Sequence, residues 1–137
     1  MKTLLKVVCE NAHLQENDTL NIIGVFDQIT THELPASHPK LAFVLILEDD
    51  QNEENHTYKY YFDVIDPNGK KIFDGKANSN PFTIEMKKGG KARIIANLQL
   101  LKFEEEGPHT ATFHFDDDIF TESIIFQVIR LQKSPLT

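Results

Sequence analysis

Three short acidic runs contain the side chains of this sequence best suited to binding a cation. They span residues 48–54, 104–106 and 116–118. Calcium takes six to eight oxygen ligands, and the loops at one end of a β-sandwich can supply them. The spacing DxDxDG of a calcium loop is absent, so solvated hairpin loops are the competing interpretation. The candidate calcium ligands are Asp49, Asp50, Glu53, Asp116, Asp117 and Asp118, and a sandwich that binds calcium or a small ligand through these loops is one of the two functions that the sequence leaves open.

Histidine and cysteine offer less chemistry. The histidines that were candidates for a metal are His32, His38, His109 and His114, and their spacing matches no HExxH pattern, so we expect surface histidines. Cys9 is the single cysteine and ends an apolar run, which favours a buried structural thiol over a nucleophile. The sequence also lacks GxSxG, Walker and GxGxxG motifs. We therefore expect a protein that is not an enzyme and has no cofactor.

Composition and charge exclude further classes. The chain has 137 residues, 40% of them hydrophobic, and a formal charge of −7. An acidic chain without a dense Lys/Arg cluster is unsuited to neutralising phosphates, so nucleic acid is not an expected partner. No apolar run is long enough for a membrane span. Lys6 interrupts the apolar N-terminus, which argues against a signal peptide, and the lone cysteine favours the cytoplasm.

Short apolar runs separated by turn chemistry predict an all-β protein. The pattern favours one antiparallel β-sandwich, immunoglobulin-like or C2-like, over residues 1–132, with a flexible tail at 133–137. Two turns, "KKGG" and "DDDI", predict β-hairpins between the strands that flank them. In the strand at 91–101 we expect Ile94, Ala96, Leu98 and Leu100 to face inward. The eight or nine expected strands lie at 4–10, 19–29, 40–49, 56–66, 71–77, 82–86, 91–101, 109–115 and 120–131.

Two of these strands are apolar on both faces. In the strand at 40–49 the outer residues include Val44 and Ile46. In the last strand they are Ile125, Ile129 and Leu131. Covering loops are one explanation, and a subunit interface is the other, because soluble monomers rarely expose large apolar patches. The second explanation predicts a protein that binds a protein partner or forms a homo-oligomer.

A glycine interrupts the second expected strand. Gly24 lies at the centre of "LNIIGVFDQI", where a glycine weakens a strand unless the backbone needs it. We expect a structural role, either a bulge or a tight crossing that turns Leu20, Ile22 and Phe26 toward the core. The alternative is that the backbone of a partner packs on Gly24.

The N-terminal pattern resembles that of an uncharacterised bacterial domain-of-unknown-function family. Its members open with a strand that ends in Cys, an acidic residue and alanine, here Cys9, Glu10 and Ala12. A strand of the type "LNIIGVFD" and a proline-containing loop follow, and "HTYKYYFDVIDPNGK" and the last hairpin resemble the second half of the family. The resemblance implies a β-sandwich of bacterial or phage-linked origin, without an activity or catalytic residues. The acidic loop 48–54 departs from the family pattern.

Overall fold

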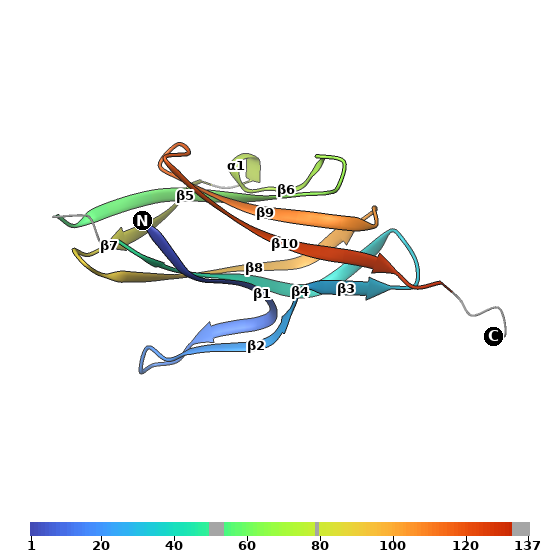
Figure 1. Ribbon diagram of the computed structural model, residues 1–137, viewed down its shortest axis with the longest axis horizontal. Coiled ribbons are helices and arrows are strands. Elements are labelled where there is room, and N and C mark those ends of the chain that lie inside the picture. Colours follow the sequence, from blue (N-terminus) through green and yellow to red (C-terminus); the bar gives the residue numbers. More distant parts are fainter. Residues whose placement is uncertain (50–53, 79, 133–137) are drawn as a thin grey trace.

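The computed structural model describes residues 1–49, 54–78 and 80–132 and contains two β-sheets that face each other (Figure 1). One single-turn helix, α1 (Gly75–Asn78), accompanies the strands. The strands are β1 (Lys2–Leu14), β2 (Leu20–Phe26), β3 (Gln28–Thr31), β4 (Ala36–Glu48), β5 (His56–Ile65), β6 (Lys71–Asp74), β7 (Phe82–Met86), β8 (Lys91–Phe103), β9 (Gly107–Phe115) and β10 (Phe120–Arg130). The tail at 133–137 lies outside the described residues.

The pairing of the strands confirms the expected β-sandwich. The first sheet has the order β2-β1-β4-β8, and its strands all run antiparallel. The second sheet has the order β3-β10-β9-β5-β6, with β7 also paired to β5. Only the β3–β10 pair is parallel among the described strands. The described part of the chain has one strand more than the sequence predicts, because the expected strand 19–29 divides at Asp27 into β2 and β3.

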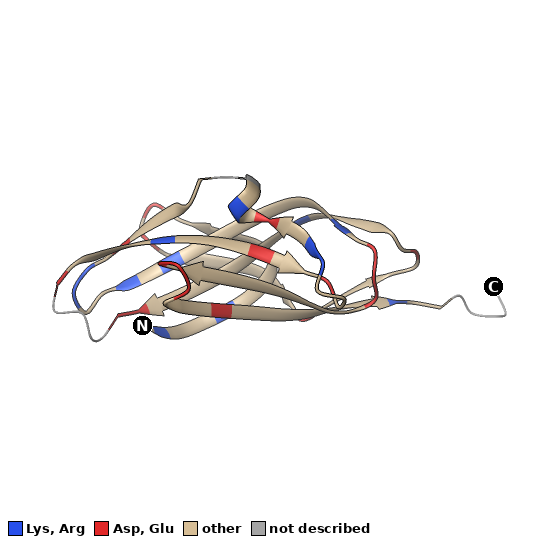
Figure 2. Ribbon diagram, turned by 90° about the horizontal axis from the view of Figure 1, so that it is seen from above, with Lys and Arg blue, Asp and Glu red and all other residues tan. Residues whose placement is uncertain are grey.

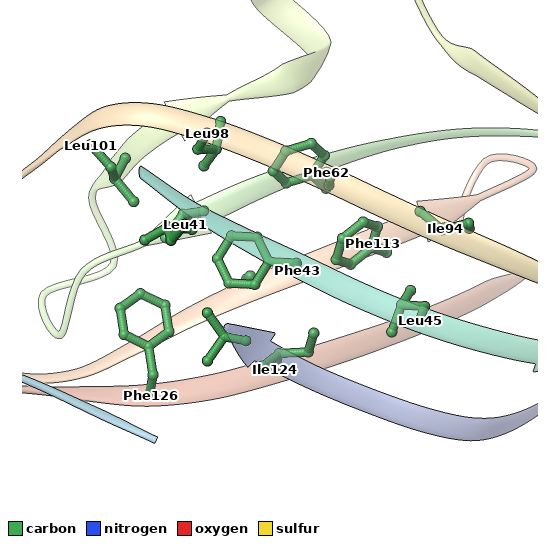
Figure 3. Packing of buried hydrophobic residues seen from close by; sticks show 14 of the residues in the cluster. Leu41, Phe43, Leu45, Phe62, Ile94, Leu98, Leu101, Phe113, Ile124 and Phe126 are labelled. Atoms are coloured by element: carbon green, nitrogen blue, oxygen red, sulfur yellow. The ribbon is translucent and has the colours of Figure 1, made fainter. Parts of the chain in front are cut away.

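The core between the sheets is built around phenylalanine rings (Figure 3). Phe43 of β4 lies at its centre, with ring centroids 6.1 Å from Phe62, 6.4 Å from Phe113 and 6.0 Å from Phe126. Phe62, Phe113 and Phe126 lie at inward positions of β5, β9 and β10, where side chains point alternately to the two faces of the sheet. Aromatic burial of this extent provides a core that needs no disulfide.

The outer face of β4 is covered by the β1–β2 hairpin. The second half of β1 bends away and lies with β2 below β4 and β8 in Figure 1. It forms a second small cluster in which Cys9, Ala12, Ala42 and Val44 are buried. At the turn of the hairpin, Arg93 of β8 donates a hydrogen bond to the carbonyl of Asp18. The two-sided apolar pattern of β4 thus reflects burial on both faces within one chain.

Gly24 lies in β2, three residues before the chain passes from the first sheet to the second. The β1–β2 register is unbroken from Leu14 opposite Leu20 to Val8 opposite Phe26, so the pairing contains no bulge at Gly24. Gly24 has a φ of +70°, and a Cβ there would lie 2.8 Å from Oε2 of Glu10. After Phe26 the chain leaves the first sheet and enters the second as β3. The pairing contradicts the bulge, and the tight crossing stays a prediction, since the change of sheet lies at Asp27, three residues after Gly24.

The predicted "KKGG" hairpin is wrong. β7 pairs with β5 in the second sheet, whereas β8 pairs with β4 in the first, so residues 87–90 connect two sheets. The turn itself forms, with the amide of Gly90 donating to the carbonyl of Lys87. Local turn chemistry reverses the chain, but it does not decide which strands become neighbours. The second predicted hairpin is confirmed, since β9 and β10 pair from Phe115 opposite Phe120.

Leu100 does not face inward as the alternation predicts. It has a φ of +56° and is 70% exposed, and the inward positions continue at Leu101 and Phe103 instead. Leu100 lies opposite Pro39 of β4, and the β4–β8 pairing keeps the same register on both sides of this point. The inward positions of β4 shift at the same place. They have odd numbers from Leu41 onward, whereas before Pro39 the half-buried residue is His38. Both strands therefore rotate together, which a period of two along one strand cannot reveal.

One edge of the second sheet is interrupted by α1. β6 and β7 both pair with β5, along its C-terminal and N-terminal parts respectively. Gly75 begins the helix, and a Cβ there would lie 2.2 Å from the carbonyl oxygen of Phe62. Only glycine lets α1 approach β5 this closely. No helix of the described residues has the length and apolarity needed to cross a membrane.

Candidate functional site

A pocket of about 560 Å³ opens on the outer face of the second sheet. It lies between β5, the end of β9, the β9–β10 turn and the segment from α1 to β7. We call it the Tyr61 pocket. Its lining residues are Lys59, Tyr60, Tyr61, Lys76, Asn80, Pro81, His114, Asp116, Asp117 and Ile119.

Tyr61 is held on its side of the pocket by two neighbours. The β5–β9 register places it opposite His114, and the two rings stack with centroids 4.6 Å apart and planes 14° from parallel. The Lys76 ammonium lies 5.5 Å from the centroid of the Tyr61 ring, a cation–π contact. Burial, followed by the charges of Asp118 and Asp63, raises the pKa of the Tyr61 phenol. Tyr61 therefore stays neutral and serves as a rigid aromatic wall.

His114 is fixed between two carboxylates. Its Nε2 lies 3.0 Å from Oδ2 of Asp63, and its Nδ1 lies 2.5 Å from Oδ1 of Asp118. Asp63 is buried on β5, whereas Asp118 belongs to the exposed turn that follows β9. A neutral imidazole has one N–H and can donate to one of these carboxylates, while an imidazolium can donate to both. Either form orients the ring and joins the turn to the sheet.

The β9–β10 turn has a backbone that is rare for residues other than glycine. Asp116, Asp117 and Asp118 all have left-handed φ values, of +46°, +55° and +69°. Aspartate tolerates this region better than most residues, because its short side chain bonds to nearby groups. The consequence is that Ile119 projects from the turn with 83% of its surface exposed.

Asp116 anchors the turn to β5. Its Oδ1 accepts the amide of Lys59 at 2.9 Å, and its Oδ2 lies 2.8 Å from Nε2 of His56. Burial acts to raise the pKa of Asp116, but the hydrogen bonds from His56 and Lys59 outweigh it and lower this pKa. The carboxylate of Asp116 is therefore a structural acceptor at neutral pH.

Three further charged side chains line the pocket. Lys59 and Lys76 line it, and neither forms an ion pair with a residue that the structure describes. Asp117 adds a carboxylate from the exposed β9–β10 turn. Along the ribbon in the view of Figure 2, acidic and basic positions are interspersed. The pocket thus combines apolar walls with a rim of both charges, which suits binding and does not assemble a nucleophile.

Comparison with known proteins places the chain in a family. A family model, described as a family of unknown function (DUF6941), matches residues 4–129. The chain belongs to the DUF6941 family. This confirms the expectation of an uncharacterised family, and the bacterial origin stays a prediction.

Two further comparisons add no activity to this DUF6941 chain. No curated protein matches it. Among solved structures it is similar to a family 123 glycoside hydrolase from Clostridium perfringens, studied for glycolipid glycan hydrolysis, with 12% identity and a TM-score of 0.44. That match covers 96% of this chain and 28% of the hydrolase, so the chain spans less than a third of its length.

The candidate calcium ligands that the structure describes form hydrogen bonds with different partners within the protein. Asp49 is buried and accepts the hydroxyl of Tyr58 at 2.8 Å, while Asp116 and Asp118 bind histidines. Asp50 and Glu53 lie outside the described residues. Among the residues that the structure describes, no group of three or more His, Cys, Asp or Glu side chains can hold a metal ion. Calcium binding stays a prediction, and a rise of the melting temperature in millimolar calcium is its test.

The candidate interface residues occupy three different environments. Val44 is fully buried under the β1–β2 hairpin, which removes it from any interface of the folded chain, and Ile46 beside it is half-buried. Ile125 is 61% exposed and Leu131 is 41% exposed, with half-buried Ile129 between them along β10. The expected patch on the last strand therefore exists as scattered side chains, while the patch on β4 is internal.

Cys9 and His109 are both enclosed. The Cys9 thiol donates weakly to the carbonyl of Ala42, and burial raises the pKa of this thiol. His109 was expected at the surface, but it is buried between the rings of Phe103 and Phe126. Inward positions of β9 have odd numbers, so the strand that places His114 outside places His109 inside. This alternation was visible in the sequence and could have separated the two histidines.

The sequence did not predict that the residues of the Tyr61 pocket lie together. Tyr61, Lys76 and His114 come from β5, α1 and β9, and no motif joins them in the sequence. Alternation places Tyr61 and Asp63 on one face of β5. The β5–β9 register that sets Tyr61 against His114 is a tertiary property. No local signal could have supplied it.

Proposed function

We propose that this DUF6941 chain is a non-catalytic binding module that recognises a segment of a partner protein at the Tyr61 pocket. The observation that carries the proposal is Ile119, an apolar side chain that is 83% exposed at the mouth of a pocket of about 560 Å³. Binding sites between proteins typically centre on an apolar or aromatic anchor that is surrounded by a polar rim. Ile119, Pro81 and Tyr61 correspond to the anchor.

The rim gives the partner segment a definite chemistry. Lys59 and Asp117 lie on it with exposed side chains. A segment with one apolar side chain for the pocket, flanked by polar or charged residues, satisfies both the walls and the rim. Rim charges of this kind affect association rate and specificity more than affinity.

Two features support a role without catalysis. The only cysteine, Cys9, is buried in the small cluster with a raised thiol pKa, which disfavours the thiolate that a nucleophile needs. Both ring nitrogens of His114 contact carboxylates, so neither is directed to a ligand. The pocket therefore offers positions for contact and no group placed for proton transfer.

The test uses a matched pair of surface variants. Displayed random peptides are selected against the wild-type chain, and the enriched peptides are then measured against Ile119→Asp and Ile125→Asp. Both side chains are exposed on this side of the molecule, but only Ile119 lines the pocket. We expect Ile119→Asp to weaken binding about tenfold or more and Ile125→Asp to leave it unchanged. Failure to enrich peptides, or equal binding to both variants, contradicts the proposal.

A further inference from the structure

The first sheet ends in a long strand without a neighbour on its outer side. Among the described strands, β8 pairs with β4 alone, and its 13 residues make it the longest edge of either sheet. The other edge strands, β2, β3, β6 and β7, have 7, 4, 4 and 5 residues. Long edges present unpaired backbone amides and carbonyls, and natural proteins usually shorten or cover them.

The flank of the sandwich beside this edge is open and apolar. A cavity of about 280 Å³ lies between β8 and the second sheet, lined by Ile95, Ala96 and Asn97 on one side and by aromatic rings on the other. The rings are Tyr60, Phe62 and Phe82. Phe82 is 47% exposed there and stacks on Tyr60 with centroids 5.4 Å apart. A strand added to β8 would cover this flank.

The charges at the two ends of β8 fit a second copy of the same strand. The turn before β8 carries exposed Lys87 and Lys88, and the loop after it carries exposed Glu104 and Glu105. In an antiparallel pair of β8 strands centred on Ala96, residues equally far from Ala96 face one another. Lys87 of one copy then lies beside Glu105 of the other, and Lys88 beside Glu104, whose carboxylate also pairs with Lys70 and Lys102 of its own chain. No two like charges face each other in this register.

The kink at Leu100 limits the matching of faces in this register to the regular part of β8, because exposed Leu100 would face buried Ala92. Ile94 and Leu98 face one another and both point inward, while Arg93 and Gln99 face one another and are both exposed. The regular part of β8 therefore pairs with matching faces, as a continuous sheet requires. The connections 87–90 and 104–106 each join the first sheet to the second. In such a dimer both therefore lie on the side of the first sheet that faces the second sheet.

We propose that β8 is a self-association edge, at which two copies join their first sheets through antiparallel β8 strands related by a two-fold axis at Ala96. A two-fold dimer uses the same surface on both copies. The interface is formed by β8 of the first sheet, whereas the Tyr61 pocket lies on the second sheet, and Tyr60 lines both the pocket and the flank beside β8. The proposal consequently does not depend on the proposed function.

Charge reversal tests the edge directly. Lys87 and Glu105 form no ion pair with a residue that the structure describes, so Lys87→Glu and Glu105→Lys disturb no contact within the described fold. Each variant alone sets like charges together at both ends of the dimer. Analytical ultracentrifugation should show a Kd about tenfold higher than that of the wild type for each. An equimolar mixture restores both opposite-charge pairs, so its heterodimer should regain the wild-type Kd. Lys2→Glu and Asp27→Lys, at exposed positions away from β8, are matched controls and should leave the Kd unchanged.

Amide hydrogen exchange identifies the surface used. In the wild type, protection of the β8 amides between 92 and 100 should rise with protein concentration. A wild-type chain that stays monomeric at its highest soluble concentration overturns the proposal. Self-association without added protection of β8, or without recovery in the mixture of Lys87→Glu and Glu105→Lys, also overturns it.

Discussion

Replacing Gly24 with alanine measures how much stability the left-handed backbone at this position of β2 requires of a glycine. The φ of +70° at Gly24 lies in the left-handed region, where an alanine costs about 1 kcal/mol. The new Cβ would also lie 2.8 Å from Oε2 of Glu10 and 2.9 Å from Cδ and Cγ. Because these atoms belong to the end of a flexible side chain, Glu10 can move away for up to about 1 kcal/mol. We expect Gly24→Ala to lower the free energy of unfolding by about 1–2 kcal/mol.

Two variants separate these contributions in urea denaturation. Gly89 has a φ of +63° and an open surrounding, so Gly89→Ala reports the backbone strain alone, about 1 kcal/mol. In the background of Glu10→Ala, the cost of Gly24→Ala should fall to that of Gly89→Ala. The slope of the free energy against urea should stay unchanged, because the exposed surface of the unfolded chain is the same.

Three outcomes would contradict a strained left-handed backbone at Gly24 that also contacts Glu10. If Gly24→Ala and Gly89→Ala cost the same in the wild-type background, the contact with Glu10 has no energetic weight. If neither variant is destabilised, the positive φ carries no strain and the structural role of Gly24 falls. A normal stability together with lost self-association would instead indicate a partner packed on Gly24.

Three further predictions concern the core. Phe43→Ala should lower the free energy of unfolding by about 3–5 kcal/mol in urea denaturation, because Phe43 touches three other rings at the centre of the sandwich. Burial lowers the pKa of His109, so the unfolded chain binds a proton that the folded chain excludes. The contribution of neutral His109 to the free energy of unfolding is fully present above the ordinary histidine pKa of about 6.5, and it should fall below that pH by up to about 1.4 kcal/mol per pH unit. His109→Phe should flatten this dependence, which urea midpoints measured across that pH range would show. Cys9 is fully buried with a raised thiol pKa, so its native reaction with a thiol reagent should be about a hundredfold slower than in urea, and an equal rate would contradict its burial.

The sequence predicts the fold class well because strand patterning is local. Alternation in β5, β9 and β10 and the two-sided apolar pattern of β4 follow from side chains that point to opposite faces of a strand. The same rule fails at Leu100, where a positive φ rotates the strand and changes the inward set. It also leaves open what covers the outer face of β4, since burial by a hairpin and burial by a second subunit give the same pattern.

Strand order and the candidate site required the tertiary structure. The turn "KKGG" reverses the chain as its residues predict, yet β7 and β8 belong to different sheets, because pairing depends on contacts far apart in the sequence. The Tyr61 pocket depends on the same kind of contact. Tyr61 meets His114 only through the β5–β9 register, and Asp63 meets His114 across the same pair of strands.

The sequence by itself determined that this chain is an all-β protein with a phenylalanine-rich core, because hydrophobic periodicity is a property of neighbouring residues. The tertiary structure decided which side chains share a surface, since the register and order of strands are set by the packing of the whole chain. The tertiary structure therefore placed Val44 inside the fold and Ile119 at the mouth of a pocket. It also placed β8 at the edge of the first sheet, a position that the sequence of β8 alone does not predict.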